Sequence, residues 1–297
     1  MKTQIRLACL AIAGLFLSVA ALSAKEKKKV DESWKETVTT TPAGDFPMLD
    51  PCSLIFNVSW NGVVKAGQAD IDITVAKDGD HPGAIETRAR ARSTGVARVI
   101  WPYTADLHSW VDPKSLRPIY VTQTEADRSK QTEHETKFIG DFVFNKRVRT
   151  PLSAPEEGKE RVKIEDEEEI TERVYETPQR INDLFSSVLY VRSMPLDEDG
   201  KTFRMITCPF DGRYLVELTQ EGREKFKYQG KQINAVKFDI TVSKVMKNES
   251  LKEIGEKIKK ATVWMSDDEL RLPLEIRAEI FVGSVRATLM EHRSLKE

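Results

Sequence analysis

The sequence has few histidines and cysteines and almost no net charge. Its 297 residues include three cysteines and four histidines, and the formal net charge at pH 7 is −1. The histidines are scattered, no two stand at the spacing of zinc ligands, and no cysteine cluster could complete a site. We therefore expect no metal ion. The balanced charge indicates neither a nucleic-acid-binding surface nor a strongly basic membrane-binding surface.

Short catalytic motifs are absent as well. The sequence contains no Gly-x-Ser-x-Gly elbow, no phosphate-binding glycine loop and no dinucleotide fingerprint. Asp106, His108 and Ser109 lie close together, but on one strand Asp106 and His108 would share a face while Ser109 would point away. We expect no cofactor and no catalytic residues. A protein that is not an enzyme is favoured, with a hydrolase as a distant alternative.

Only one run of residues is apolar enough for a membrane, and it stands at the amino terminus. Lys2 and Arg6 precede an uncharged run over residues 7–24, which ends at a lysine. This layout, with small residues at its end, is typical of a secretory signal peptide cleaved after Ala24. We predict a signal peptide over residues 1–24, a periplasmic mature protein and no transmembrane span after cleavage. The alternative is a retained anchor, since the run is at the short end of what spans a bilayer.

The rest of the chain divides by composition. Residues 25–48 are polar, with a run of lysines and little apolar periodicity, and we expect them to form a flexible leader. Trp34 is the one unusual residue there, and a lone aromatic residue in such a tail usually has no partner. Residues 49–297 are expected to form a single β-rich domain, interrupted by a densely charged, solvated insertion over residues 154–173.

Alternation of apolar and polar residues dominates this domain. Phe56 and Trp60 belong to a run of period two, and the pair Asn61-Gly62 that follows suits a hairpin turn with positive φ. Similar short segments recur to the end of the chain, most of them joined by short polar turns, which favours antiparallel pairing. The predicted fold class is mainly β, either a curved antiparallel sheet or a partly open β-barrel.

Two segments break the alternation and are predicted to be helices. Over residues 181–192 the apolar residues fall on one wide stripe between two prolines, so we expect an amphipathic helix buried against the sheet. Over residues 250–260 the apolar spacing is also helical, and Ser250 with Glu253 makes a capping-box pattern. The prediction there is a small inserted helix.

Cys52 and Cys208 are the two cysteines that remain after signal cleavage. In an oxidising compartment they can form a disulfide, which would close a loop of about 155 residues. The alternative is a pair of separate buried thiols, because cysteine also behaves as a small hydrophobic residue.

Three arginines share one face of a strand predicted over residues 85–93. Arg88, Arg90 and Arg92 alternate with threonine and alanine residues, whose small side chains can pack closely inward. The arginine stripe is a candidate for contact with an anionic group. The alternative is that it forms the solvent-exposed face of a sheet.

A set of short segments carries a family resemblance. The segments are, in order, FNVSWNG at 56–62, AG at 66–67, RARARSTG at 88–95, SWVDP at 109–113, RP at 117–118, DLFSSVLYVR at 183–192 and FDG at 210–212. Together they resemble the exported bacterial family catalogued as domain of unknown function 3108, over about residues 50–292. The resemblance implies an exported protein with a β-rich fold and supplies no catalytic residues. A weaker likeness, at the level of fold, is to periplasmic lipoprotein carriers of the LolA type, in which a curved sheet wraps helices around an apolar cavity.

The helix stripe and several aromatic strand residues together suggest a binding site. If the predicted helix closes a curved sheet, the side chains between them would line a cavity for an acyl chain or another apolar molecule. The residues expected there are Phe56, Trp60, Trp101, Leu184, Phe185 and Val188. The competing interpretation is that they fill the core. The sequence therefore favours a non-catalytic binding module for an apolar or lipid-like envelope component, with a structural or assembly protein contacting another envelope protein as the alternative.

Overall fold

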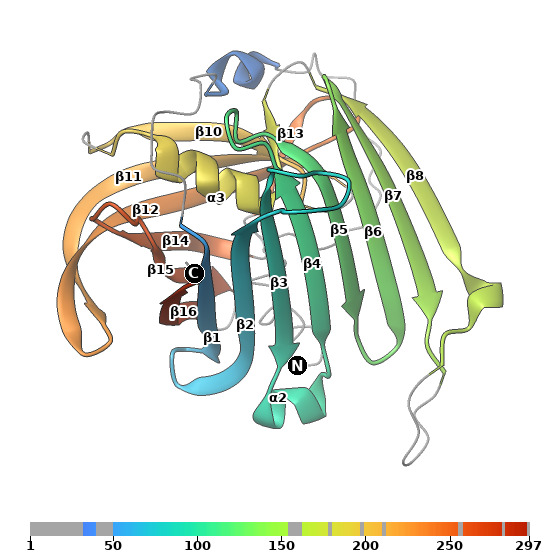
Figure 1. Ribbon diagram of the computed structural model, residues 1–297, viewed down its shortest axis with the longest axis horizontal. Coiled ribbons are helices and arrows are strands. Elements are labelled where there is room, and N and C mark those ends of the chain that lie inside the picture. Colours follow the sequence, from blue (N-terminus) through green and yellow to red (C-terminus); the bar gives the residue numbers. More distant parts are fainter. Residues whose placement is uncertain are drawn as a thin grey trace.

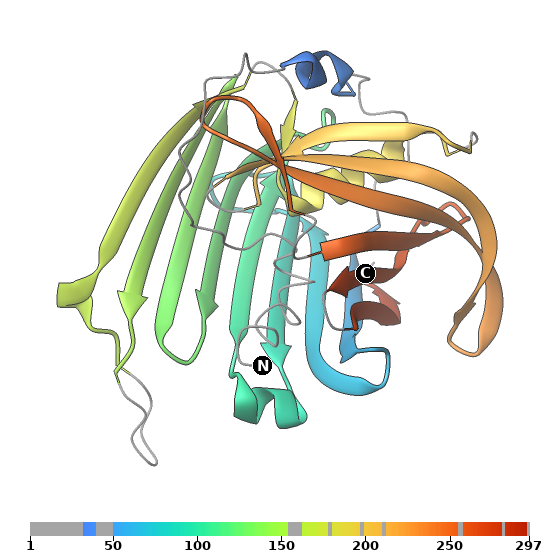
Figure 2. The ribbon, with the colours of Figure 1, turned by 180° about the vertical axis from the view of Figure 1, so that it is seen from behind.

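One strongly curved sheet contains the described strands of the protein (Figures 1 and 2). The computed structural model describes residues 32–39, 50–153, 162–177, 180–196, 199–209, 212–254, 258–280 and 283–295. Within them, the sheet has 16 strands. All but one follow the order β8-β7-β6-β5-β4-β3-β2-β1-β16-β15-β14-β12-β11-β10-β9, and β13 pairs with β12 beside this path. Neighbouring strands are antiparallel, apart from β9 and β10. The predicted fold class is confirmed.

The elements have the following bounds. The strands are β1 (Cys52–Trp60), β2 (Val64–Val75), β3 (Ile85–Ser93), β4 (Thr104–Val111), β5 (Pro118–Ala126), β6 (Lys130–Ile139), β7 (Phe142–Pro151), β8 (Glu169–Glu176), β9 (Ile181–Asn182), β10 (Thr202–Thr207), β11 (Arg213–Tyr228), β12 (Lys231–Val245), β13 (Leu251–Glu253), β14 (Ile258–Ser266), β15 (Pro273–Ile280) and β16 (Ser284–Ser294). The helices are η1 (Ser33–Thr37), α2 (Gly95–Ile100), η2 (Glu165–Glu167) and α3 (Leu184–Ser193).

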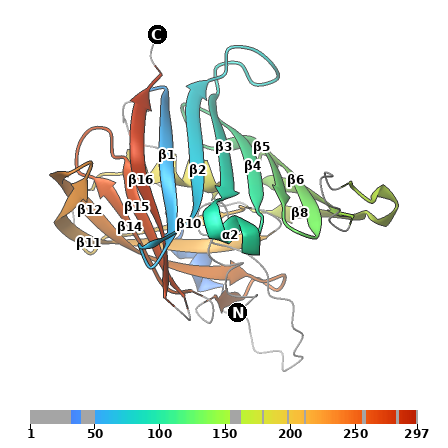
Figure 3. The same cartoon turned by 90° about the horizontal axis from the view of Figure 1, so that it is seen from below.

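Pairing of the first strand with the last joins two meanders into this sheet. β1 to β8 lie in chain order on one side, and β10 to β16 lie on the other. β1 and β16 pair from Cys52↔Ser294 to Trp60↔Val285, with one bulge, and they lie side by side in Figure 3. β8 and β9 end the strand order, so the barrel formed by the described residues is open.

The predicted hairpin at the start of the domain is confirmed. Asn61 and Gly62 have φ values of 51° and 71°. Turns that match the right-handed twist of two antiparallel strands require this left-handed backbone, which asparagine and glycine adopt most readily. The turn therefore fixes the register of β1 against β2, in which Phe56 is paired with Ala69.

α3 lies inside the curve of the sheet (Figure 1). The helix predicted over residues 181–192 is confirmed, but it begins at Leu184, since residues 181–182 form β9. Asp183 sets this start. Its side chain accepts a hydrogen bond from the Ser186 backbone N–H at 2.6 Å, and the Ser186 Oγ accepts one from the Asp183 N–H at 2.8 Å. This reciprocal cap satisfies two N–H groups that a helix end leaves without partners.

The small inserted helix predicted over residues 250–260 is wrong where the chain is described. Leu251–Glu253 is strand β13, which pairs with β12 from Val245↔Leu251 to Ser243↔Glu253, and β14 begins at Ile258. Residues 255–257 lie outside the described residues. Backbone pairing with β12 overrides a helical preference that the glycine in this segment already weakens.

The flexible leader predicted over residues 25–48 is wrong for residues 32–39, and its other residues lie outside the described part. Trp34 in η1 is 7% exposed and packs in a cluster with Val143 and Ile206. Its Nε1 donates a hydrogen bond to the Glu249 carbonyl at 3.0 Å. Burial of Trp34 and this hydrogen bond hold the segment against the sheet. Its polar composition gave no sign of this contact.

The charged insertion predicted over residues 154–173 is in part an edge strand. Residues 154–161 lie outside the described residues, but β8 begins at Glu169 and pairs with β7. Glu169 also lies 3.2 Å from Arg149 of β7. Charged side chains on an edge strand discourage pairing with other chains, so the composition suits its place.

The cysteines are buried thiols in different clusters of core side chains. Cys52 packs with Leu54 and Leu289, and Cys208 with Ile206. Burial raises the pKa of the Cys52 thiol to about 11. Of the two alternatives drawn from the sequence, the structure has the separate thiols, and the disulfide is not formed.

The predicted signal peptide over residues 1–24 lies outside the described residues. In the part of the chain that the structure describes, no helix is long and apolar enough to cross a membrane.

Replacing Trp34 with alanine tests the docking of η1. We expect the free energy of unfolding to fall by roughly 3 kcal/mol, because large-to-small changes at buried aromatic residues cost about that much. Urea denaturation would measure the change, with Glu36→Ala at an exposed position of η1 as the control. An unchanged urea midpoint in Trp34→Ala would mean that docking of η1 does not stabilise the fold, as expected for a flexible leader.

Candidate ligand-binding site

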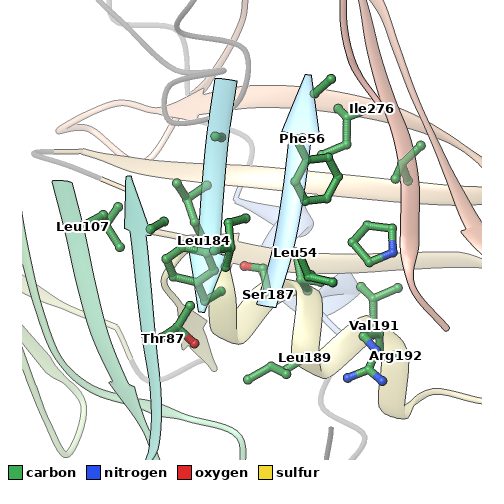
Figure 4. A pocket seen from close by; sticks show the side chains of 18 of the residues that line it. Leu54, Phe56, Thr87, Leu107, Leu184, Ser187, Leu189, Val191, Arg192 and Ile276 are labelled. Carbon is green, nitrogen blue, oxygen red and sulfur yellow. The ribbon is translucent and has the colours of Figure 1, made fainter. Parts of the chain in front are cut away.

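A cavity of about 240 Å³ lies between the concave face of the sheet and α3 (Figure 4). Its walls come from β1 to β5, from α3, and from β10 to β12 and β14 to β16, so both meanders contribute. Most lining side chains are apolar. The polar ones are Thr87, Gln123, Ser187, Arg192 and Thr207.

Small side chains make the room. Ala69, Ala91 and Ala105 are direct neighbours across β2, β3 and β4, and all three line the cavity. Ala89 lines it one pair further along β3. The sequence predicts that this small face packs closely inward. Instead, α3 stays at a distance from it, and the missing side-chain volume becomes the cavity.

Four of the six side chains predicted to line a cavity do so. Phe56 comes from β1, and Leu184, Phe185 and Val188 come from α3. Figure 4 shows Phe56 and Leu184 facing the same space from opposite walls. These residues line the same space because the apolar stripe of the helix faces the inward-facing positions of the strand.

Trp60 and Trp101 are not among the lining residues. Trp60 is half-buried at the end of β1, next to the turn. Trp101 is buried after α2, where its ring stacks on Tyr103 with 4.8 Å between centroids. Trp60 is the last residue of β1, and Trp101 lies in the connection between α2 and β4, so both lie beyond the part of the sheet that lines the cavity.

Sequence reasoning missed the contribution of the second meander. Val216, Ile240, Val263 and Ile276 line the cavity from β11, β12, β14 and β15. Alternation marks them as inward-facing, but only the pairing of β1 with β16 places them opposite the first meander. The alanines on the inward face of β3 were a weak indication of a cavity, because small side chains there are compatible with close packing as well.

Two polar side chains near the start of α3 line the cavity without hydrogen-bond partners among the described residues. Thr87 is fully buried and Gln123 is 2% exposed. The Thr87 Oγ1 and both amide atoms of Gln123 make no hydrogen bond there. Burying such atoms unpaired costs about 1–3 kcal/mol each, so this end of the cavity is suited to a group that donates and accepts hydrogen bonds.

Arg192 lines the cavity at the other end of α3, away from Thr87 (Figure 4). Its Nε lies 3.1 Å from the carbonyl oxygens of both Leu270 and Arg271. Burial lowers the pKa of the guanidinium to about 10, which leaves it charged at neutral pH. This end of the cavity therefore carries positive charge.

Polar contacts fix α3 at both ends. At its start, the Ser109 Oγ of β4 donates to the Asp183 carboxylate at 2.5 Å, while burial raises the pKa of that carboxyl group. At its end, the Arg271 Nη1 donates to the carbonyls of Arg192 and Met194 at 2.5 and 2.6 Å. The helix is thus tied to both meanders.

His108 and Ser109 point to opposite faces of β4, as predicted. The His108 Nε2 lies 2.6 Å from the Glu86 carboxylate, and burial lowers the pKa of the imidazole. Ser109 projects from the opposite face, toward Asp183. Among the described residues, no group of three or more histidine, cysteine, aspartate or glutamate side chains comes together to hold a metal ion.

The arginine stripe lies on the outer face and pairs with carboxylates. Arg88 lies 2.8 Å from Glu86, and Arg90 and Arg92 lie 3.8 Å from Asp72 and Asp70 respectively. All three guanidinium groups are exposed. These ion pairs, one within β3 and two across to β2, account for the stripe as a solvent-exposed face, and no feature of it points to an external anion.

Comparisons with known proteins place the chain in a family and support its fold. The model of the family described as "Protein of unknown function (DUF3108)" matches residues 55–290. No curated protein matches. A β-barrel-like protein of domain of unknown function DUF1849 from Brucella abortus is similar in structure, with a TM-score of 0.52 and 8% identity over 84% of this chain and 99% of that one. A protein with a YmcC-like fold from Bacteroides fragilis gives a TM-score of 0.30 and 10% identity, over 84% and 99%.

Substitution of Asp183 tests the attachment of α3. We expect Asp183→Ala to lower the free energy of unfolding by roughly 2 kcal/mol, since it removes a helix cap and leaves the Ser109 hydroxyl without its acceptor. Asp183→Asn should lose less, because asparagine also caps helices. Urea denaturation of both variants would decide. A native midpoint in Asp183→Ala would mean that the cap does not hold the helix.

Proposed function

This chain belongs to the DUF3108 family of proteins of unknown function, and from that premise we propose that it is a non-catalytic binding protein for an apolar or lipid-like component of the cell envelope. The apolar cavity between the sheet and α3 carries the proposal. Concave sites lined mostly by hydrophobic side chains, with a few placed polar groups, are typical of small-molecule binding. An acyl chain would gain the free energy of leaving water there.

The polar atoms at the cavity ends favour an amphiphilic ligand. Gln123 offers a donor and an acceptor, and Thr87 offers a hydroxyl group, next to apolar walls from Leu107 and Leu184. A hydroxyl, amide or carboxylic acid group attached to an acyl chain would satisfy these atoms. We therefore propose a ligand that is apolar along most of its length and hydrogen-bonded at one end.

The proposed place of action is the periplasm. A positively charged start followed by an apolar run over residues 7–24 supports export. After cleavage, residues from Lys25 onward would meet apolar molecules of the envelope.

Filling the cavity tests the proposal. Ala89 faces the cavity, so we expect Ala89→Leu to weaken binding of a fluorescent fatty acid about tenfold, because overpacking costs roughly 1–3 kcal/mol. The matched control is Arg90→Leu, one residue along on the outer face, which should bind as the native protein does. Mass spectrometry of an organic extract of the purified protein would identify a copurified ligand.

Two results would count against the binding role. One is native protein that carries no extractable lipid and ignores fluorescent fatty acids. The other is equal binding by the Ala89→Leu and native proteins, which would place the probe elsewhere on the surface.

An assembly role is the second candidate, and one observation favours it. The outer face at the free edge of the sheet exposes five large apolar side chains from β6, β7 and β8: Ile139, Phe142, Phe144, Ile170 and Val174. Phe144 and Val174 are direct cross-strand neighbours. Exposed apolar patches of this kind mark surfaces where another protein can bind through its side chains.

Photo-crosslinking tests this second candidate. A photoreactive residue in place of Phe144 should give a discrete adduct in cells, and the pair Ile170→Ser and Val174→Ser should abolish it, because it removes the apolar contact area. The same residue in place of Arg90, on the outer face of β3, is the control. No adduct at position 144, or the same adduct at both positions, would count against an assembly role.

A further inference from the structure

The end of the sheet that carries α2 exposes a second group of apolar side chains, which we call the apolar tip. It consists of Val63 and Val64 at the β1–β2 turn and Val96, Val99 and Ile100 of α2. These five residues are between 48% and 85% exposed. Water-exposed valine and isoleucine lose the burial that stabilises them elsewhere, so their clustering at one place indicates a contact.

The two parts of the tip form one surface. α2 packs against β2, and the Thr94 N–H just before the helix donates to the Ala66 carbonyl at 3.0 Å. Figure 1 shows α2 and the β1–β2 turn at the same, lower end of the sheet, and Figure 3 views this end directly. The tip therefore lies at one end of the strands.

Basic side chains border the tip. Lys65 and Arg98 are exposed, and the Arg128 Nη2 donates to the Val99 carbonyl at 2.6 Å. Residues 57–67 and 92–104 contain no aspartate or glutamate. The nearby Asp127 is engaged within its own turn, where it accepts hydrogen bonds from Ser129. An apolar centre with a positive rim suits an anionic surface.

We propose that the apolar tip docks on the surface of an anionic phospholipid bilayer. The valine and isoleucine side chains would enter the boundary between headgroups and acyl chains, and the basic rim would contact lipid phosphates. The apolar patch on β6, β7 and β8 differs from the tip in charge. Lys146 of β7 and Glu172 of β8 are cross-strand neighbours beside it, so charges of both signs border that patch. That patch suits a protein contact, whereas the tip suits lipid.

The tip is connected to the cavity. Trp101 follows α2, and its stack with Tyr103 packs against Ala91 and Ala105, which line the cavity. A molecule docked through the tip would hold the cavity close to the bilayer, with buried apolar side chains between the two. The apolar tip and the cavity are thus built on the same strands. Docking of the tip does not require a ligand in the cavity.

Vesicle flotation tests the proposal with the chain from Lys25 onward. Native protein should float with vesicles of phosphatidylcholine containing about one third phosphatidylglycerol, less with phosphatidylcholine alone, and less at high salt. The pair Val96→Ser and Val99→Ser should reduce the bound fraction roughly tenfold, given the apolar area removed. The matched control is the pair Ile170→Ser and Val174→Ser, two further exposed apolar residues on strand β8, which should float as native protein does.

Three outcomes would overturn the proposal. The tip variant could float as well as native protein, both double variants could lose binding equally, or the tip variant could change oligomeric state in sedimentation instead, which would mark a protein interface. If the tip variant misfolds by circular dichroism, the pair Lys65→Gln and Arg98→Gln must lower binding to anionic vesicles only. Ala89→Leu should leave flotation unchanged, so failure of the cavity and failure of the tip are distinguishable.

Discussion

The pairing of β1 with β16 is the constraint on which the rest of the structure depends. Each meander alone would be a twisted sheet with one apolar face in water. Joined along this seam, the two faces turn toward each other, and α3 can be buried between them. Phe56 of β1 and Ala287 of β16 both line the cavity, so the seam itself is part of its wall.

The position of α3 decides whether the concave face is filled or hollow. Polar contacts hold the helix at Asp183 and at Arg192, and each of these charged groups is buried. Burial of a charge is costly unless hydrogen bonds compensate for it, so these two contacts fix where the helix ends lie. A helix held at both ends cannot move inward over the alanines, and the space remains.

Local patterns in the sequence predicted the elements well and their long-range partners poorly. Alternation and the Asn61-Gly62 turn identified the strands and the hairpin, and the apolar stripe identified α3 with three of its cavity-lining residues. The burial of Trp34, the strand at Leu251–Glu253 and the cavity residues of the second meander each depend on a neighbour far away in the chain. No local pattern encodes that neighbour. Trp60 failed for a related reason, because alternation gives the face of a side chain but not its height along the sheet. Trp101 failed because it lies in the connection between α2 and β4 and not on a strand.

Two features of the cavity reduce stability in the same region, and one kind of molecule would offset both. Each buried methylene group contributes about 0.8 kcal/mol, so a core that served stability alone would carry larger side chains than Ala69, Ala91 and Ala105. It would also pair the polar atoms of Thr87 and Gln123, whose burial without partners has its own cost. An acyl chain would fill the space beside the alanines, and a hydrogen-bonding group at its end would pair with the polar atoms of Thr87 and Gln123. Polar atoms without partners inside an apolar space are what an amphiphilic ligand requires, so the two features together support the proposed binding role.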